Sequence, residues 1–120
     1  MIQVYHNPRC GKSRDCLAFL DQTKQEYQII KYLENVPTFE ELQTIISKLK
    51  LKPIELVRQK EKIWIENFKN KTLSDSEIIQ TMASNPILIE RPIVINGDKA
   101  LIARPFDKVK AILWSLQNII

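Results

Sequence analysis

The residues of this chain best suited to chemistry surround Cys10. The sequence from His6 to Arg14 reads His-Asn-Pro-Arg-Cys-Gly-Lys-Ser-Arg, between an apolar run at residues 2–5 and an amphipathic stretch that begins at Asp15. Cys10 therefore falls where a predicted strand gives way to a predicted helix. The first backbone N–H groups of a helix lack intrahelical partners, and the helix dipole is positive there, so an anion such as a thiolate is stabilised.

Cationic neighbours strengthen this prediction. Arg9 and Lys12 flank Cys10, and Arg14 lies one helical turn further on. A helix N-terminus with adjacent cations lowers a cysteine pKa from about 8.5 to roughly 3.5–7.5. We therefore predict that Cys10 is largely ionised at neutral pH and acts as a nucleophile. The alternative is an inert buried cysteine, and the polar residues on both sides argue against it.

The second cysteine, Cys16, has a different predicted role. On a helix it lies roughly 9 Å along the axis from Cys10, which is beyond comfortable disulfide reach. Its neighbours Phe19 and Leu20 favour a buried structural thiol. Because the chain has no C-x-x-C motif, an external thiol must complete any redox cycle that Cys10 begins.

Length and composition predict one domain, residues 1–120, since 120 residues with 44% hydrophobic content can build a real core. The net charge of +4 raises the question of nucleic acid. Without zinc-finger spacing, an aromatic-rich binding strand or a long basic block, we expect binding of a small anion and no nucleic acid. We also expect no metal, no bound cofactor, no membrane contact and a cytoplasmic location, because the chain shows no secretory or membrane-length apolar segment.

The elements that position Cys10 follow from the sequence pattern. A strand at 2–5, a helix at about 11–21 and a strand at 27–33 form a predicted βαβ unit, so the two strands are parallel. Cys10 then lies at the carboxyl end of the first strand, where open α/β sheets place their ligands.

The rest of the chain reads as helices, then a hairpin, then a last helix. Capping-box patterns begin at Thr38 and Ser74, and Pro53 can open a short helix between them. Residues 93–95 and 100–103 flank an Asn-Gly turn typical of a hairpin. A helix at 107–116 closes the chain, with Val109, Ile112, Leu113 and Leu116 on its buried side.

This order of elements, with an X-Pro step directly before the third strand, resembles the thioredoxin/glutaredoxin fold. The resemblance implies an α/β protein with a mixed four-stranded sheet and a helical insertion, at about residues 34–90, between strands 2 and 3. It also implies that Pro92, which in that family is cis and lies beside the cysteine, follows a cis peptide bond. From sequence alone, trans is the default for any X-Pro bond.

A narrower resemblance is to the glutaredoxin-coupled arsenate reductases. It is carried by blocks that occur in the family's order along nearly the whole chain: residues 5–14, Tyr-Leu-Glu-Asn at 32–35, Glu-Leu-Val-Arg at 55–58, residues 85–94 and Arg-Pro at 104–105. The resemblance implies that the cysteine thiolate attacks arsenate or a related oxyanion, that glutathione is the co-substrate, and that glutaredoxin resolves the mixed disulfide. Carried over by position, Cys10 is the nucleophile, Arg58, Arg91 and Arg104 bind the oxyanion, and His6 and Arg14 are the loop histidine and helix arginine.

The chemistry asks for arginines independently of the resemblance. An oxyanion approaching a thiolate is repelled unless fixed cations neutralise the charge, and arginine donates two parallel hydrogen bonds. The alternative, a solvated surface arginine, stays open for Arg58 because a polar run follows it. Arg91 and Arg104 each precede a proline and adjoin a predicted strand. His6 either hydrogen bonds within the loop or tunes Cys10 electrostatically.

Two other functions remain alternatives. Spx-type regulators share this fold family, bind RNA polymerase and sense oxidants through C-x-x-C, but Ser13 stands where their second cysteine would be. A related glutathione-linked thiol oxidoreductase with another substrate is the other alternative. Lys12 in place of the family's usual threonine, and an end soon after the last predicted helix, keep it open.

Overall fold

The computed structural model of the protein describes residues 1–113, which form two compact units. Among the described residues, the first unit comprises Met1–Asn35 and residues 91–113. The second comprises Val36–Glu90 and corresponds to the helical insertion predicted at about 34–90. That the whole chain forms one domain stays a prediction. No helix in the part that the structure describes is long and apolar enough to cross a bilayer.

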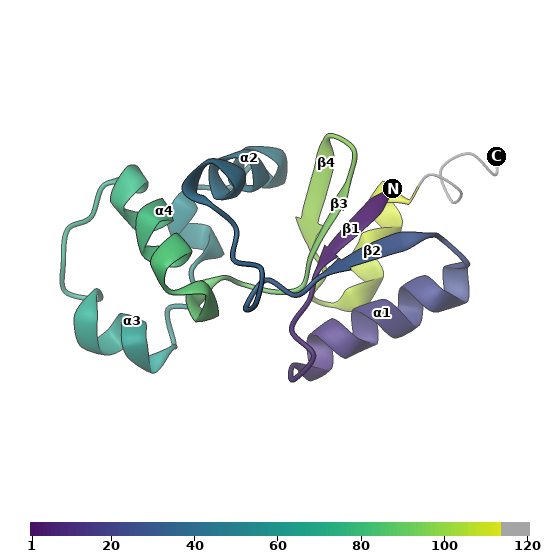
Figure 1. The fold of residues 1–120 in the computed structure, drawn as a ribbon, viewed down its shortest axis with the longest axis horizontal. Coiled ribbons are helices and arrows are strands. Elements are labelled where there is room, and N and C mark those ends of the chain that lie inside the picture. Colours follow the sequence, from purple (N-terminus) through teal and green to yellow (C-terminus); the bar gives the residue numbers. More distant parts are fainter. Residues whose placement is uncertain (114–120) are drawn as a thin grey trace. The chain divides into compact units, whose positions relative to one another are not determined.

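The first unit is built on a four-stranded sheet with the order β2-β1-β3-β4 (Figure 1). Its strands are β1 (Ile2–Tyr5), β2 (Tyr27–Ile30), β3 (Ile93–Asn96) and β4 (Lys99–Ile102). β1 is parallel to β2 and antiparallel to β3, and β3 is antiparallel to β4. The predicted mixed four-stranded sheet is confirmed.

The second strand was predicted at 27–33 but is shorter in the structure, where β2 ends at Ile30. The backbone turns at the next residue, where the carbonyl of Lys31 accepts hydrogen bonds from the N–H groups of Glu34 (3.0 Å) and Asn35 (2.8 Å). Tyr32, expected in the strand, is instead buried within this turn. The aromatic and β-branched composition of 27–33 masked the change from strand to turn.

Helix α1 (Gly11–Thr23) and the 3₁₀ helix η3 (Phe106–Ile112) pack together with the sheet of the first unit. Their shared core includes Cys16 and Leu20 of α1, Val4 and Val94 of the central strands, and Val109 of η3. The last helix, predicted at 107–116, is a 3₁₀ helix over its described part. Val109, Ile112 and Leu113 are buried, as predicted. Leu116 lies outside the described residues.

The predicted hairpin joins β3 to β4. Asn96 pairs with Lys99, so Gly97 and Asp98 form a two-residue turn, and Gly97 has a φ of +66°. Glycine suits this position because a Cβ disfavours positive φ. The side chain of Asn96 is buried and donates a hydrogen bond to the carbonyl of Ile112, which ties the hairpin to η3.

The second unit is helical. It contains α2 (Phe39–Leu49), η1 (Pro53–Leu56), α3 (Lys62–Asn67), α4 (Asp75–Ser84) and η2 (Pro86–Leu88). Both predicted capping boxes are present, between Thr38 and Glu41 and between Ser74 and Glu77. Each satisfies N–H groups that would otherwise lack partners at the start of a helix.

Candidate active site

Strand register brings four segments to one end of the sheet. Tyr5 at the end of β1 is aligned with Ile30 of β2 and Ile93 of β3, and Ile93 is aligned with Ile102 of β4. The chain that follows β1, β2 and β4 and the chain that precedes β3 therefore meet at this end. These segments carry, respectively, the Cys10 loop, Lys31, Arg104 and Arg91.

The loop after β1 places Cys10 at the N-cap of α1, as predicted. The N–H of Cys10 donates to the carbonyl of Asn7 at 3.0 Å, and the N–H of Arg9 donates to the Asn7 side-chain oxygen, also at 3.0 Å. The N–H of Asn7 donates to Ser13 Oγ at 3.4 Å. The Asn7 and Ser13 side chains thus stabilise a tight turn that places Cys10 at the N-terminus of α1.

The surroundings of Cys10 favour its ionised form. Burial opposes ionisation, since the residue is only 9% exposed. The backbone N–H groups of Ser13 and Lys12 interact with the sulfur and stabilise the thiolate, although the Cys10 side chain makes no capping hydrogen bond of normal geometry. The Arg91 guanidinium adds both charge and a hydrogen bond. The net effect lowers the pKa of Cys10 below the ordinary 9.0.

Arg91 is thus the predicted arginine that the structure brings to the thiol. It precedes Pro92, and the Arg91–Pro92 peptide bond is cis, as the resemblance implied. Arg104 follows β4 at the same end of the sheet, and its bond to Pro105 is also cis. Arg91 and Arg104 are both partly buried and do not lie on the fully solvated surface.

Arg58 belongs to the second unit, where it begins a turn after η1. Its backbone N–H donates to the carbonyl of Leu88 at 2.7 Å, and its guanidinium forms an ion pair with Glu61 at 2.9 Å. An oxyanion that binds Arg58 would therefore compete with the Glu61 carboxylate. Its role in binding stays a prediction.

Arg14 contacts the reactive loop, which comprises residues 6–10 and carries Cys10. Its Nη1 donates to the carbonyl of Pro8 at 3.0 Å, so the guanidinium braces the turn that precedes Cys10. The groups that lower the Cys10 pKa are the amides of Ser13 and Lys12 and the Arg91 side chain, and Arg14 is not one of them. The structure thus gives Arg14 a bracing contact, and its proposed influence on the thiol stays a prediction.

Cys16 lies in the core between α1, the sheet and η3 and is fully buried. Burial raises the pKa of this thiol to about 11, so it is protonated at neutral pH. Both cysteines are free. The prediction that Cys16 is a buried thiol is confirmed.

His6, at the start of the loop, is 5% exposed. Its Nδ1 is buried and has no hydrogen-bond partner among residues 1–113. Burial, and then the positive charges of Lys31 and Arg14, lower the pKa of His6 below 6.5. The imidazole is therefore neutral at neutral pH.

Acidification is expected to destabilise the fold through His6. The unfolded chain takes up a proton at His6 near pH 6.5, whereas the folded chain resists protonation to lower pH. The stabilisation is complete above pH 6.5 and is lost as the pH falls below that value and through the folded pKa. Urea unfolding of wild type and a His6→Gln variant at several pH values measures this, and the wild type is expected to lose more stability on acidification. Equal losses in the two proteins would contradict the assignment.

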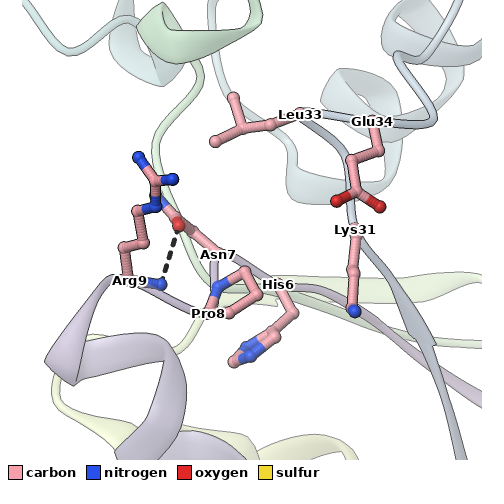
Figure 2. A pocket seen from close by; sticks show the side chains of 7 residues that line it. All are labelled: His6, Asn7, Pro8, Arg9, Lys31, Leu33 and Glu34. Atoms are coloured by element: carbon pink, nitrogen blue, oxygen red, sulfur yellow. Dashed lines mark hydrogen bonds between the residues drawn. The ribbon is translucent and has the colours of Figure 1, made fainter.

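A pocket of about 310 Å³ lies beside the reactive loop. One wall is formed by loop residues 6–9, and the other by Lys31, Leu33 and Glu34 from the turn after β2 (Figure 2). Lys31 is a residue of the site for which the sequence pattern predicted no role. The signal that could have found it is its place directly after a strand parallel to β1, because the carboxyl ends of parallel strands share one edge.

Comparisons with known proteins show which family this chain resembles. The family model of the ArsC family matches residues 5–112. An arsenate reductase of Haemophilus influenzae is 41% identical over 114 residues, which cover 93% of this chain and 98% of that protein. An arsenate reductase of Neisseria meningitidis serogroup A is 35% identical over 114 residues, with 93% and 97% covered. The solved structure of an arsenate reductase from Vibrio cholerae is 41% identical, has a TM-score of 0.89, and is matched over 93% of this chain and 97% of that chain.

Proposed function

Because this chain belongs to the ArsC family, we propose that it reduces arsenate to arsenite through Cys10, with glutathione and glutaredoxin as reductants. The observation that supports this most strongly is the pairing of Cys10 with Arg91, since a cation at the sulfur both favours the thiolate and attracts an oxyanion. Arsenate is proposed as the substrate because two similar proteins are named arsenate reductases.

In the first step the Cys10 thiolate attacks the arsenic atom of arsenate. A sulfur–arsenic bond forms, and one arsenate oxygen takes up protons and leaves as water. Arg91 and Arg104 hold the remaining oxygens, and their charges offset the repulsion between the thiolate and the anion. Arg58 is the third oxyanion-binding arginine that the family resemblance implies. Each such charged hydrogen bond is worth about 1.5–3 kcal/mol.

In the second step the glutathione thiolate attacks the Cys10 sulfur. A disulfide forms between Cys10 and glutathione, and the electron pair of the sulfur–arsenic bond passes to arsenic, which leaves as arsenite. A glutaredoxin thiolate then attacks the glutathione sulfur and releases Cys10 as a thiolate. The burial of Cys16 supports this use of external thiols.

The test is arsenite formation by the wild-type protein, with glutathione and glutaredoxin each supplied or omitted. We expect turnover that requires both. Absence of arsenate turnover, with thiol–disulfide exchange at Cys10 intact, would overturn the proposal in favour of a related thiol oxidoreductase. Absence of both activities, together with co-purification of RNA polymerase, would overturn it in favour of a regulator.

A further inference from the structure

The pocket beside the reactive loop has no part in holding arsenate in the reaction above. We propose that this pocket binds the thiol co-substrate, and that it selects thiols that carry carboxylate and ammonium groups, as glutathione does. The inference rests on the proposed function and assigns the glutathione site to a surface distinct from the arginines that face the oxyanion.

The pocket lies close enough to Cys10 to place a thiol at the sulfur. The hydrogen bond from the Cys10 N–H to the Asn7 carbonyl closes a four-residue turn, which brings the two Cα atoms within about 7 Å. Asn7 and Arg9, on either side of this turn, both line the pocket. Cys10 therefore follows directly after the loop wall of the pocket and lies within one backbone turn of residues that line it.

The charges of the pocket match such a ligand. Arg9 lies on the loop wall, and Lys31 and Glu34 lie on the opposite wall, with open space between them (Figure 2). None of these three side chains forms an ion pair or hydrogen bond within residues 1–113. Two cations and one carboxylate are thus available for the carboxylates and the ammonium of the ligand. Pro8 and Leu33 offer apolar contact to the peptide backbone and the methylene groups of the ligand.

His6 contributes a mostly buried polar side chain to the lining of the pocket. It lines the pocket, is 5% exposed, and leaves Nδ1 without a partner in the described chain. A buried polar atom without a hydrogen bond costs stability, so such atoms are usually satisfied. The volume of about 310 Å³ lies at the lower end of the range for small-molecule sites.

The test uses Cys10 without arsenate. The thiolate attacks oxidised glutathione, a disulfide forms between Cys10 and one glutathione, and the other glutathione leaves as a thiolate. The rate of this step is compared with the rate for hydroxyethyl disulfide, which has the same reacting bond but no charge. Mass spectrometry follows the modified Cys10 in wild type, Arg9→Gln, Lys31→Gln and the double variant.

We expect each single variant to slow the reaction with oxidised glutathione about threefold and the double variant about tenfold, because each exposed ion pair is worth up to about 1 kcal/mol. The rate with hydroxyethyl disulfide should change less than twofold. Lys99→Gln is the matched control for lost charge, since Lys99 is exposed and its pairing with Asn96 places it at the opposite end of the sheet.

Equal slowing with both disulfides, or no slowing with either, would overturn the inference. So would a rise in the KM for arsenate with the KM for glutathione unchanged, because the pocket would then hold the oxyanion. If wild type reduces no arsenate but still prefers oxidised glutathione through Arg9 and Lys31, the proposed function fails and the pocket assignment stands.

Discussion

A Cys10→Ser variant is expected to have no detectable arsenate reductase activity, whereas Cys16→Ala keeps most of it. A serine hydroxyl is not ionised near neutral pH and cannot form the disulfide with glutathione that the proposed reaction requires. Cys16 is fully buried in the core with a pKa raised to about 11, so it does not exchange with thiols. The measurement is arsenite formation at saturating arsenate, glutathione and glutaredoxin.

Stability is the control for both cysteine variants. Cys16→Ala removes a buried sulfur and is expected to lower the free energy of unfolding, while Cys10→Ser should change it little. Alanine is used at Cys16 because a serine would bury a hydroxyl. Activity that survives in Cys10→Ser, or that vanishes in a folded Cys16→Ala, would contradict the assignment of Cys10 as the nucleophile.

The second large effect is expected at Arg91. Arg91→Met should lower kcat/KM for arsenate by about 10- to 100-fold, which corresponds to one lost charged hydrogen bond. It should also raise the pKa of Cys10, because the guanidinium supplies both charge and a hydrogen bond to the sulfur. Steady-state kinetics and the pH dependence of Cys10 alkylation measure the two effects separately.

Arg91→Lys separates charge from geometry. An ammonium keeps the positive charge but cannot donate two parallel hydrogen bonds, so the thiol pKa should return most of the way while the arsenate kcat/KM stays low. Lys99→Gln, at the far end of the sheet, controls for the loss of one charge. If Arg91→Met and Lys99→Gln behave alike in both measurements, Arg91 has no part in the site.

The location of Cys10 at the start of a helix could be predicted because it depends on local sequence. The change from an apolar run to a helical pattern placed Cys10 at the N-cap of α1, and the structure confirms it. The helix caps at Thr38 and Ser74 were predictable for the same reason, since a capping box is complete within four residues. The Asn96–Gly97 hairpin is a third local signal.

Features that depend on contacts between distant segments were harder to predict. Lys31 reaches the site only because β2 ends at Ile30 and pairs in parallel with β1. The buried Nδ1 of His6 and the contact of Arg14 with the Pro8 carbonyl depend on how the loop folds back. Periodicity could not distinguish the 3₁₀ helix η3 from an α-helix, because both place apolar residues at similar spacing.

The central claim is that helix-end amides and the Arg91 guanidinium lower the pKa of Cys10 below its ordinary value and so favour the thiolate. Titration of the ultraviolet absorbance of the thiolate in a Cys16→Ala background tests it most directly, because Cys10 is then the only cysteine. The account predicts a midpoint below 9.0 that moves upward in the Arg91→Met, Cys16→Ala double variant. A midpoint at or above 9.0, unchanged by loss of Arg91, would contradict it.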